Sequence, residues 1–119
     1  MEAKRFEVIV QNARRRQDDL LELKGADYTG GNADRLHNFK DNAKILDIDP
    51  ETVWAVYFMK HIAAIMTYVK DGKVQSENIT GRIDDAINYL YLLEGLIEDK
   101  RAEMFPMTHG TLTPLSHDS

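Results

Sequence analysis

Apolar side chains recur at the three- and four-residue spacing of amphipathic helices over most of this chain, and strong breakers separate the repeats. The first repeat covers residues 2–24 and is expected to end at Gly25, in the position of a C-terminal cap. A loop with a double glycine at its tip follows, and a short amphipathic helix is expected over residues 33–46. The pattern therefore predicts two helices in this first part of the chain.

Two longer helices are expected in the second part. Asp49, Pro50 and Glu51 have the order of an N-cap, a first-turn proline and a first-turn acid, which predicts a third helix over about residues 50–70. A fourth is expected over about residues 76–103. No strand pattern of useful length occurs, so the predicted fold class is all-α.

We expect these helices to form one four-helix bundle-like domain over residues 1–105. A chain of 119 residues can bury one substantial core but not two. The tail, residues 106–119, is rich in Thr, Ser, Pro, Gly and His, and is expected to be disordered.

The third helix is apolar on nearly every side, and Lys60 and His61 interrupt it in the middle. A helix of this kind is expected to be buried. Because a lysine is rarely buried without a partner, we expect Lys60 to meet an anion. The equally apolar fourth helix carries both signs of charge, at Arg82, Asp84, Asp85 and Asn88. Together the two helices predict a polar pocket of the kind that binds ligands in helical bundles.

Composition excludes several classes of function. The net charge is −5, and the basic triplet at residues 14–16 is followed at once by Asp18 and Asp19, so no stable nucleic-acid partner is expected. The chain has no cysteine, which excludes disulfides and thiol catalysis and fits a reducing cytoplasm, that of the host if a phage encodes the protein. Charges near the N-terminus argue against a signal peptide, and Lys60 with His61 argues against a membrane span.

The fourth helix carries candidate metal ligands. Asp85 and Asn88 are three residues apart, and Asp84 and Asn88 are four apart, so either pair lies on one helix face. Glu77 lies about two turns before Asp85. Oxygen ligands of this kind suit Mg²⁺ or Mn²⁺. The alternative is a surface ion pair between Arg82 and Asp85, with Glu77 as an acid favoured by the helix dipole.

The first loop and the second helix offer a candidate anion site. Asp27 lies close to the double glycine, where backbone amides can approach a ligand. Arg35 and Lys40 can add positive charge to the N-terminus of the second helix, and Asn38 can donate a hydrogen bond. The alternative is an ordinary capped surface helix with scattered charges.

His61 has two interpretations. A single histidine on a core helix is more often a satisfied structural residue than a functional one. Trp54, Tyr57 and Phe58 lie about one turn earlier, however, and favour a pocket that stacks and hydrogen-bonds a flat ligand.

Three segments, KGADYTGGNADRLHNFK, WAVYFMKHI and SENITGRIDDAINYLYLLEGLI, resemble in order and spacing a family of small phage and bacterial proteins. These are the nucleotide-modification-associated, all-α nucleoside-triphosphate pyrophosphohydrolase-like domains, distant relatives of the MazG type. The resemblance covers roughly residues 20–97. It implies a helical bundle, often dimeric or tetrameric, that binds a (deoxy)nucleotide. It also implies that acidic side chains hold magnesium while water cleaves between the α and β phosphates.

The MazG hallmark is an E-x-x-E pair on one helix and an E-x-x-D pair on a later one. This chain has Asp19 and Glu22 at the first spacing, and Asp85 and Asn88 at the second. Asp replaces Glu in the first pair, Asn replaces the closing Asp in the second, and the two pairs lie farther apart than usual.

The residues and the resemblance together predict a phage-type nucleotide-handling protein, in the first place a magnesium-dependent (d)NTP pyrophosphohydrolase. Glu77, Asp84 and Asp85 are the expected ligands of Mg²⁺ or Mn²⁺, and Asp27, Asp85 and Lys60 are the expected catalytic groups. The expected nucleotide-binding set combines cationic, polar and aromatic side chains: Arg35, Asn38, Lys40, Trp54, Lys60, His61, Arg82 and Asn88. One alternative is a protein that sequesters a nucleotide or a cyclic-nucleotide signal without cleaving it and so counteracts host defence. Another is a purely structural bundle or adaptor.

The third and fourth helices carry more apolar side chains than one four-helix core can bury, notably Tyr68, Tyr89, Tyr91, Leu92 and Leu96. Monomers rarely expose patches of this size. We therefore expect a homo-oligomer, either a dimer or a tetramer.

Overall fold

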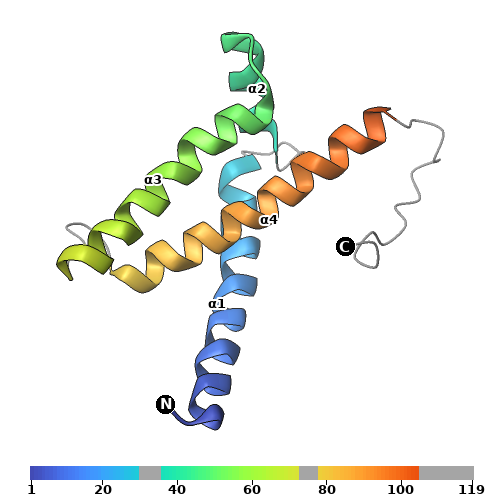
Figure 1. Ribbon diagram of the computed structural model, residues 1–119. Coiled ribbons are helices and arrows are strands. Elements are labelled where there is room, and N and C mark those ends of the chain that lie inside the picture. The colour runs from blue at the N-terminus through green and yellow to red at the C-terminus, as the bar shows by residue number, and fades with distance from the viewer. Residues whose placement is uncertain (30–35, 73–77, 105–119) are drawn as a thin grey trace.

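The computed structural model describes residues 1–29, 36–72 and 78–104, with side chains only as far as residue 22 in the first range. The described residues form four helices: α1 (Ala3–Thr29), α2 (His37–Leu46), α3 (Pro50–Asp71) and α4 (Ile79–Met104). These ranges contain no strand, so the predicted all-α fold class is confirmed. The predicted tail at residues 106–119 lies outside them. Figure 1 shows α3 and α4 close together at the end of α3 and diverging towards α2, while α1 crosses α4.

The ends of α3 and α4 follow local sequence rules. Pro50 opens α3 after Asp49, and Gly72 ends it with a φ of 74°, where its N–H donates to the Tyr68 carbonyl at 2.7 Å. Glycine adopts this left-handed conformation without the steric cost that a Cβ brings. At the start of α4, the Asn78 side-chain oxygen accepts a hydrogen bond of 2.7 Å from the Gly81 N–H, which caps the first turn.

The predicted end of the first helix at Gly25 is wrong, because α1 continues to Thr29. Glycine inside a helix costs only about 1 kcal/mol relative to alanine, which a long helix tolerates. Asp27 therefore lies in the last turns of α1 rather than in a loop, and its side chain lies outside the described part. Helix α2 begins at His37, later than predicted.

The core lies where α2 packs between the first turns of α3 and the second half of α4. Its buried apolar side chains are Leu36, Phe39, Ala43, Val53, Trp54 and Leu96. The Trp54 indole stacks on the Phe58 ring with centroids 4.7 Å apart, and its N–H donates to the Tyr89 carbonyl at 2.6 Å. Trp54 thus joins α3 to α4 by both packing and a hydrogen bond.

Most of α3 is not covered by the rest of the chain. Only Val53 and Trp54 are buried in this helix, so the expectation that Lys60 is buried is wrong for the single chain, where Lys60 is exposed. The apolar pattern showed correctly that α3 lacks a polar face, but four helices leave one side of it open. Among the described residues, α3 is also the one helix that is long and apolar enough to cross a membrane by length and composition, which is weak evidence for a span.

Candidate binding site where α1 crosses α4

Three polar side chains, Arg16, Gln17 and Asp84, meet where α1 crosses α4, and Asn88 follows Asp84 one turn later on α4. We call these four residues the polar cluster. Three of them are buried, with exposed fractions of 5% for Gln17, 8% for Asp84 and 3% for Asn88. Asp84 and Asn88 are one turn apart on α4 and so share a face. A buried polar group costs stability unless it is hydrogen-bonded, so the partners within this cluster determine its chemistry.

The carboxylate of Asp84 is the centre of the cluster. Arg16 donates to it twice, from Nε to Oδ2 at 2.8 Å and from a terminal nitrogen to Oδ1 at 3.3 Å. The Gln17 side-chain amide donates to Oδ1 and to the Asp84 carbonyl, both at 3.3 Å. The hydrogen bond to Asp84 raises the pKa of the Arg16 guanidinium above its ordinary value, because it stabilises the charged form.

Two oxygens of the cluster accept no hydrogen bond from the described residues. These are Gln17 Oε1 and Asn88 Oδ1, and both are buried. Buried acceptors in native proteins are nearly always paired, so two unpaired ones on adjacent helices are unusual. The cluster therefore combines a charge-neutral Arg–Asp pair with two amide oxygens that lack a donor.

The Arg16 side chain connects the cluster to the surface. It is 42% exposed, whereas that of Asp84 is 12% exposed. A guanidinium has five N–H donors, and Asp84 takes those on one edge. With the side chain this exposed, the other N–H groups of Arg16 are available to bind an anion.

The Lys60–His61 pair does not form one site. The His61 ring lies 4.8 Å from the Tyr89 ring on α4, whereas the Lys60 amine lies 5.5 Å from the centre of the Tyr57 ring on its own helix. Consecutive residues of a helix point about 100° apart, so the two side chains serve different surfaces. His61 borders the α3–α4 interface, and Lys60 faces outwards.

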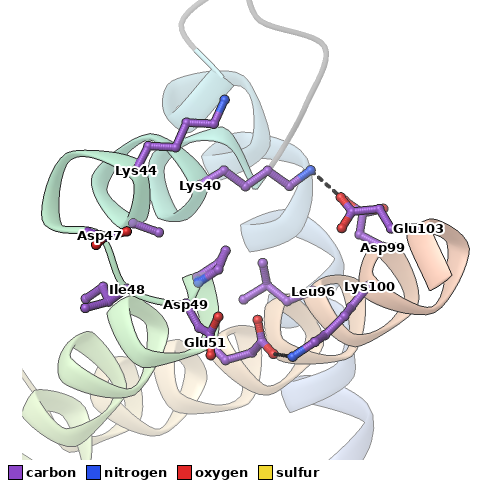
Figure 2. Close-up of a pocket in the computed structure, with 12 residues that line it drawn as sticks. Lys40, Lys44, Asp47, Ile48, Asp49, Glu51, Leu96, Asp99, Lys100 and Glu103 are labelled. Atoms are coloured by element: carbon purple, nitrogen blue, oxygen red, sulfur yellow. Dashed lines mark hydrogen bonds and ion pairs between the residues drawn. The ribbon is translucent and has the colours of Figure 1, made fainter.

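A separate cavity of about 460 Å³ lies at the other end of α4 (Figure 2). Lys40 forms an ion pair of 2.6 Å with Asp99, and Lys100 forms one of 3.1 Å with Glu51, with Leu96 between the two pairs. Lys40 was expected beside the nucleotide site. It lines this cavity, and none of the polar cluster does.

The described residues do not assemble the predicted metal site. Glu77 lies outside them, Asp84 is bound by Arg16, and Asp85 is half-buried. In the part of the chain whose side chains are described, no group of three or more acidic or histidine side chains can hold a metal ion. Because Glu77 lies outside the described residues, the magnesium site stays a prediction.

The other predicted residues are dispersed. Trp54 is a core residue with one face on Phe58, Asn38 is exposed on α2, and Arg82 is partly buried at the start of α4. Arg35 and the side chain of Asp27 lie outside the described part. Of the predicted nucleotide-binding residues, Asn88 is thus the one that the structure places in the polar cluster.

Sequence reasoning missed Arg16 and Gln17. The basic triplet at residues 14–16 was considered only in the argument about nucleic acid, although Gln17 occupies an apolar position in the spacing of the first helix. The position of Gln17 was the signal that the sequence offered, because a glutamine among the apolar positions of a helix indicates a buried amide that needs a partner.

Comparison with known proteins gives no further evidence about this site. The chain matches no protein-family model, no curated protein and no solved structure. The resemblance to pyrophosphohydrolase-like domains therefore stays a prediction, and the geometry of the cluster carries the functional argument.

Proposed function

We propose that this protein binds a nucleotide at the polar cluster, as a binding protein that holds the ligand without a metal-dependent step. The observation that carries the proposal is the pair of buried, unpaired acceptors, Gln17 Oε1 and Asn88 Oδ1, in a cluster that the partly exposed Arg16 side chain connects to the surface. A ligand that suits this arrangement has N–H donors at one end and negative charge at the other. Nucleotides have both.

The two amide oxygens suit the edge of a nucleobase. Base edges present amine and ring N–H donors, and side-chain amides of Asn and Gln pair with them through two hydrogen bonds. An unpaired buried acceptor costs about 1–3 kcal/mol, and a bound base removes that cost. Relief of this penalty contributes to binding, and because both oxygens are buried, a base reaches them only when α1 and α4 separate locally.

Arg16 suits a phosphate. Its pairing with Asp84 fixes the guanidinium and neutralises the carboxylate, which would otherwise repel an anion. The exposed N–H groups then present a planar donor edge, the geometry that favours arginine for phosphate recognition. Lys60 is not required, because it lies on another surface.

Hydrolysis is the alternative that the family resemblance implies. It requires magnesium ligands that the described residues do not assemble, whereas binding requires only the cluster. Sequestration of a nucleotide or of a cyclic-nucleotide signal is therefore the function that the geometry supports best.

The experiment is calorimetric titration with a panel of NTPs, dNTPs and cyclic dinucleotides, with and without Mg²⁺, followed by analysis of the products. We expect binding without Mg²⁺, and an affinity about tenfold lower in Asn88→Leu, the equivalent of ~1.4 kcal/mol. The matched control is Arg15→Gln, because Arg15 is the exposed neighbour that hydrogen-bonds Asn12 within α1. Absence of binding to the whole panel would contradict the proposal, and release of pyrophosphate would favour the hydrolase.

A further inference from the structure

The hydrogen bonds on Asp84 determine which way the side-chain amide of Gln17 points. Its nitrogen donates to a carboxylate oxygen and to the carbonyl oxygen of Asp84, both at 3.3 Å. Both of these oxygens are acceptors, so the reversed amide would place its own oxygen against them. The two N–H groups of the amide are used in this way, and Oε1 is left without a donor among the described residues. Gln17 therefore offers a ligand an acceptor and no donor.

Asn88 offers a second acceptor close to the first. Its Oδ1 is buried and accepts no hydrogen bond from the described residues. The carbonyl of a helical residue points towards the N–H group four residues later, so the Asp84 carbonyl points towards Asn88. The Gln17 amide is bonded to that carbonyl and therefore lies against the turn of α4 between Asp84 and Asn88. A ligand that binds at this turn meets two acceptor oxygens.

The nucleobases differ in the donors that they present along the Watson–Crick edge. Guanine has two neighbouring donors there, the ring N1–H and the N2 amine. Adenine and cytosine each have one amine beside a ring nitrogen that is itself an acceptor. Uracil and thymine have one ring N–H between two carbonyl oxygens. Guanine is therefore the base whose edge matches two acceptors without placing an acceptor of its own against either of them.

We infer that the polar cluster selects guanine nucleotides, an inference that rests on the nucleotide binding proposed above. The N1–H and N2–H groups of guanine donate to Gln17 Oε1 and Asn88 Oδ1, the two buried oxygens that lack donors. Another base leaves at least one of these oxygens unpaired, and an unpaired buried acceptor disfavours that complex. The phosphate of the nucleotide lies towards the exposed side chain of Arg16.

The base enters from the side of Asn88. Arg16 and Gln17 join α1 to α4 through Asp84, which lies one turn before Asn88 along α4. A local separation of the helices beside Asn88 therefore leaves these hydrogen bonds in place. Gln17 keeps its amide nitrogen on Asp84 during this opening and presents its oxygen to the base.

The first test is calorimetric titration of the wild-type protein with GTP, ATP, CTP and UTP in the absence of Mg²⁺. We expect GTP to bind at least about tenfold more tightly than each of the others, the effect of one hydrogen bond gained and one buried acceptor satisfied. Another nucleotide that binds as tightly as GTP overturns the selection of guanine but leaves nucleotide binding intact. Absence of binding to all four overturns both.

The second test removes the donors of guanine one at a time. Inosine triphosphate lacks the N2 amine, and 2-aminopurine riboside triphosphate lacks the N1 hydrogen. Each should bind about tenfold more weakly than GTP. The matched control is 7-deaza-GTP, which is altered only on the opposite edge of the base and should bind as GTP does. Equal affinity for inosine triphosphate and GTP, or a loss of affinity for 7-deaza-GTP, overturns the inference.

The third test removes one acceptor from the protein. Asn88→Leu should lower the preference for GTP over ATP about tenfold, because it weakens the complex with GTP and leaves that with ATP almost unchanged. The matched control is Gln11→Leu, which removes an exposed side-chain amide of α1 and should leave the preference as in wild type. Circular dichroism of both variants checks that they are folded. An equal loss of affinity for GTP and ATP in folded Asn88→Leu shows that Asn88 does not recognise the base and overturns the inference.

Discussion

Helix α4 crosses two other parts of the molecule, and the two crossings differ in kind. Near its C-terminal end, Leu96 is 3% exposed among apolar side chains of α2 and α3. In its first half, Asp84 and Asn88 are buried as well, but Asp84 binds Arg16 and Gln17 of α1. The apolar crossing has the composition expected of a core. Burying amides with unpaired oxygens at the polar crossing costs stability. Sites where a protein accepts such a cost are often functional.

The largest expected effect is at the apolar crossing. Leu96→Ala should lower the free energy of unfolding by about 2–5 kcal/mol, because it removes a buried core side chain and leaves a cavity beside Trp54 and Leu36. Urea denaturation measures it. A loss under about 1 kcal/mol would show that this crossing is not the core.

The next effect is at the charged pair of the polar crossing. Arg16→Gln should clearly lower the midpoint of thermal unfolding, because it leaves the mostly buried carboxylate of Asp84 without its cation. Arg15→Gln is the control and should change the midpoint little. Adding Asp84→Asn to Arg16→Gln should restore much of the loss, since no charge is then buried. Equal effects of the two arginine substitutions would be evidence against the pair.

A smaller effect of opposite sign is expected at Asn88. Asn88→Leu replaces a buried amide whose oxygen lacks a donor by an apolar side chain of similar size, so stability should stay unchanged or rise by about 1 kcal/mol. The same substitution should weaken nucleotide binding. Denaturation and titration of one sample therefore separate a functional role from a structural one. A marked loss of stability would mean that Asn88 holds the crossing together.

The smallest effect is at the rim of the apolar crossing. The hydrogen bond and charge of Glu51 raise the pKa of Lys100 above its ordinary value of 10.5. When folding raises the pKa of a group, the stabilisation is fully present at pH values below the pKa in the unfolded protein. It is lost as the pH rises through the pKa in the folded protein. Lys100→Gln should therefore reduce stability slightly at pH 7, and the difference from wild type should vanish only in strongly alkaline solution or at high salt. A difference that vanishes already near neutral pH would contradict this pairing.

The sequence predicted the apolar crossing better than the polar one. Helical spacing and end signals such as Pro50 and Gly72 are local, so four helices and the all-α class followed from them. The partner of Asp84 is 68 residues away along the chain, and no spacing rule connects the two helices. The prediction that Lys60 is buried failed for a related reason. The apolar pattern of a helix does not show how many other helices pack against that helix.

The most direct test of nucleotide binding at the polar cluster is a titration of ¹⁵N-labelled protein followed by NMR. Side-chain amide signals of Gln17 and Asn88 and the Nε–H signal of Arg16 report on the cluster itself. We expect these three signals to shift together on addition of the tightest-binding nucleotide, with saturation at the calorimetric affinity. Shifts confined to the cavity around Lys40 and Lys100, or no shifts at all, would contradict the proposed site.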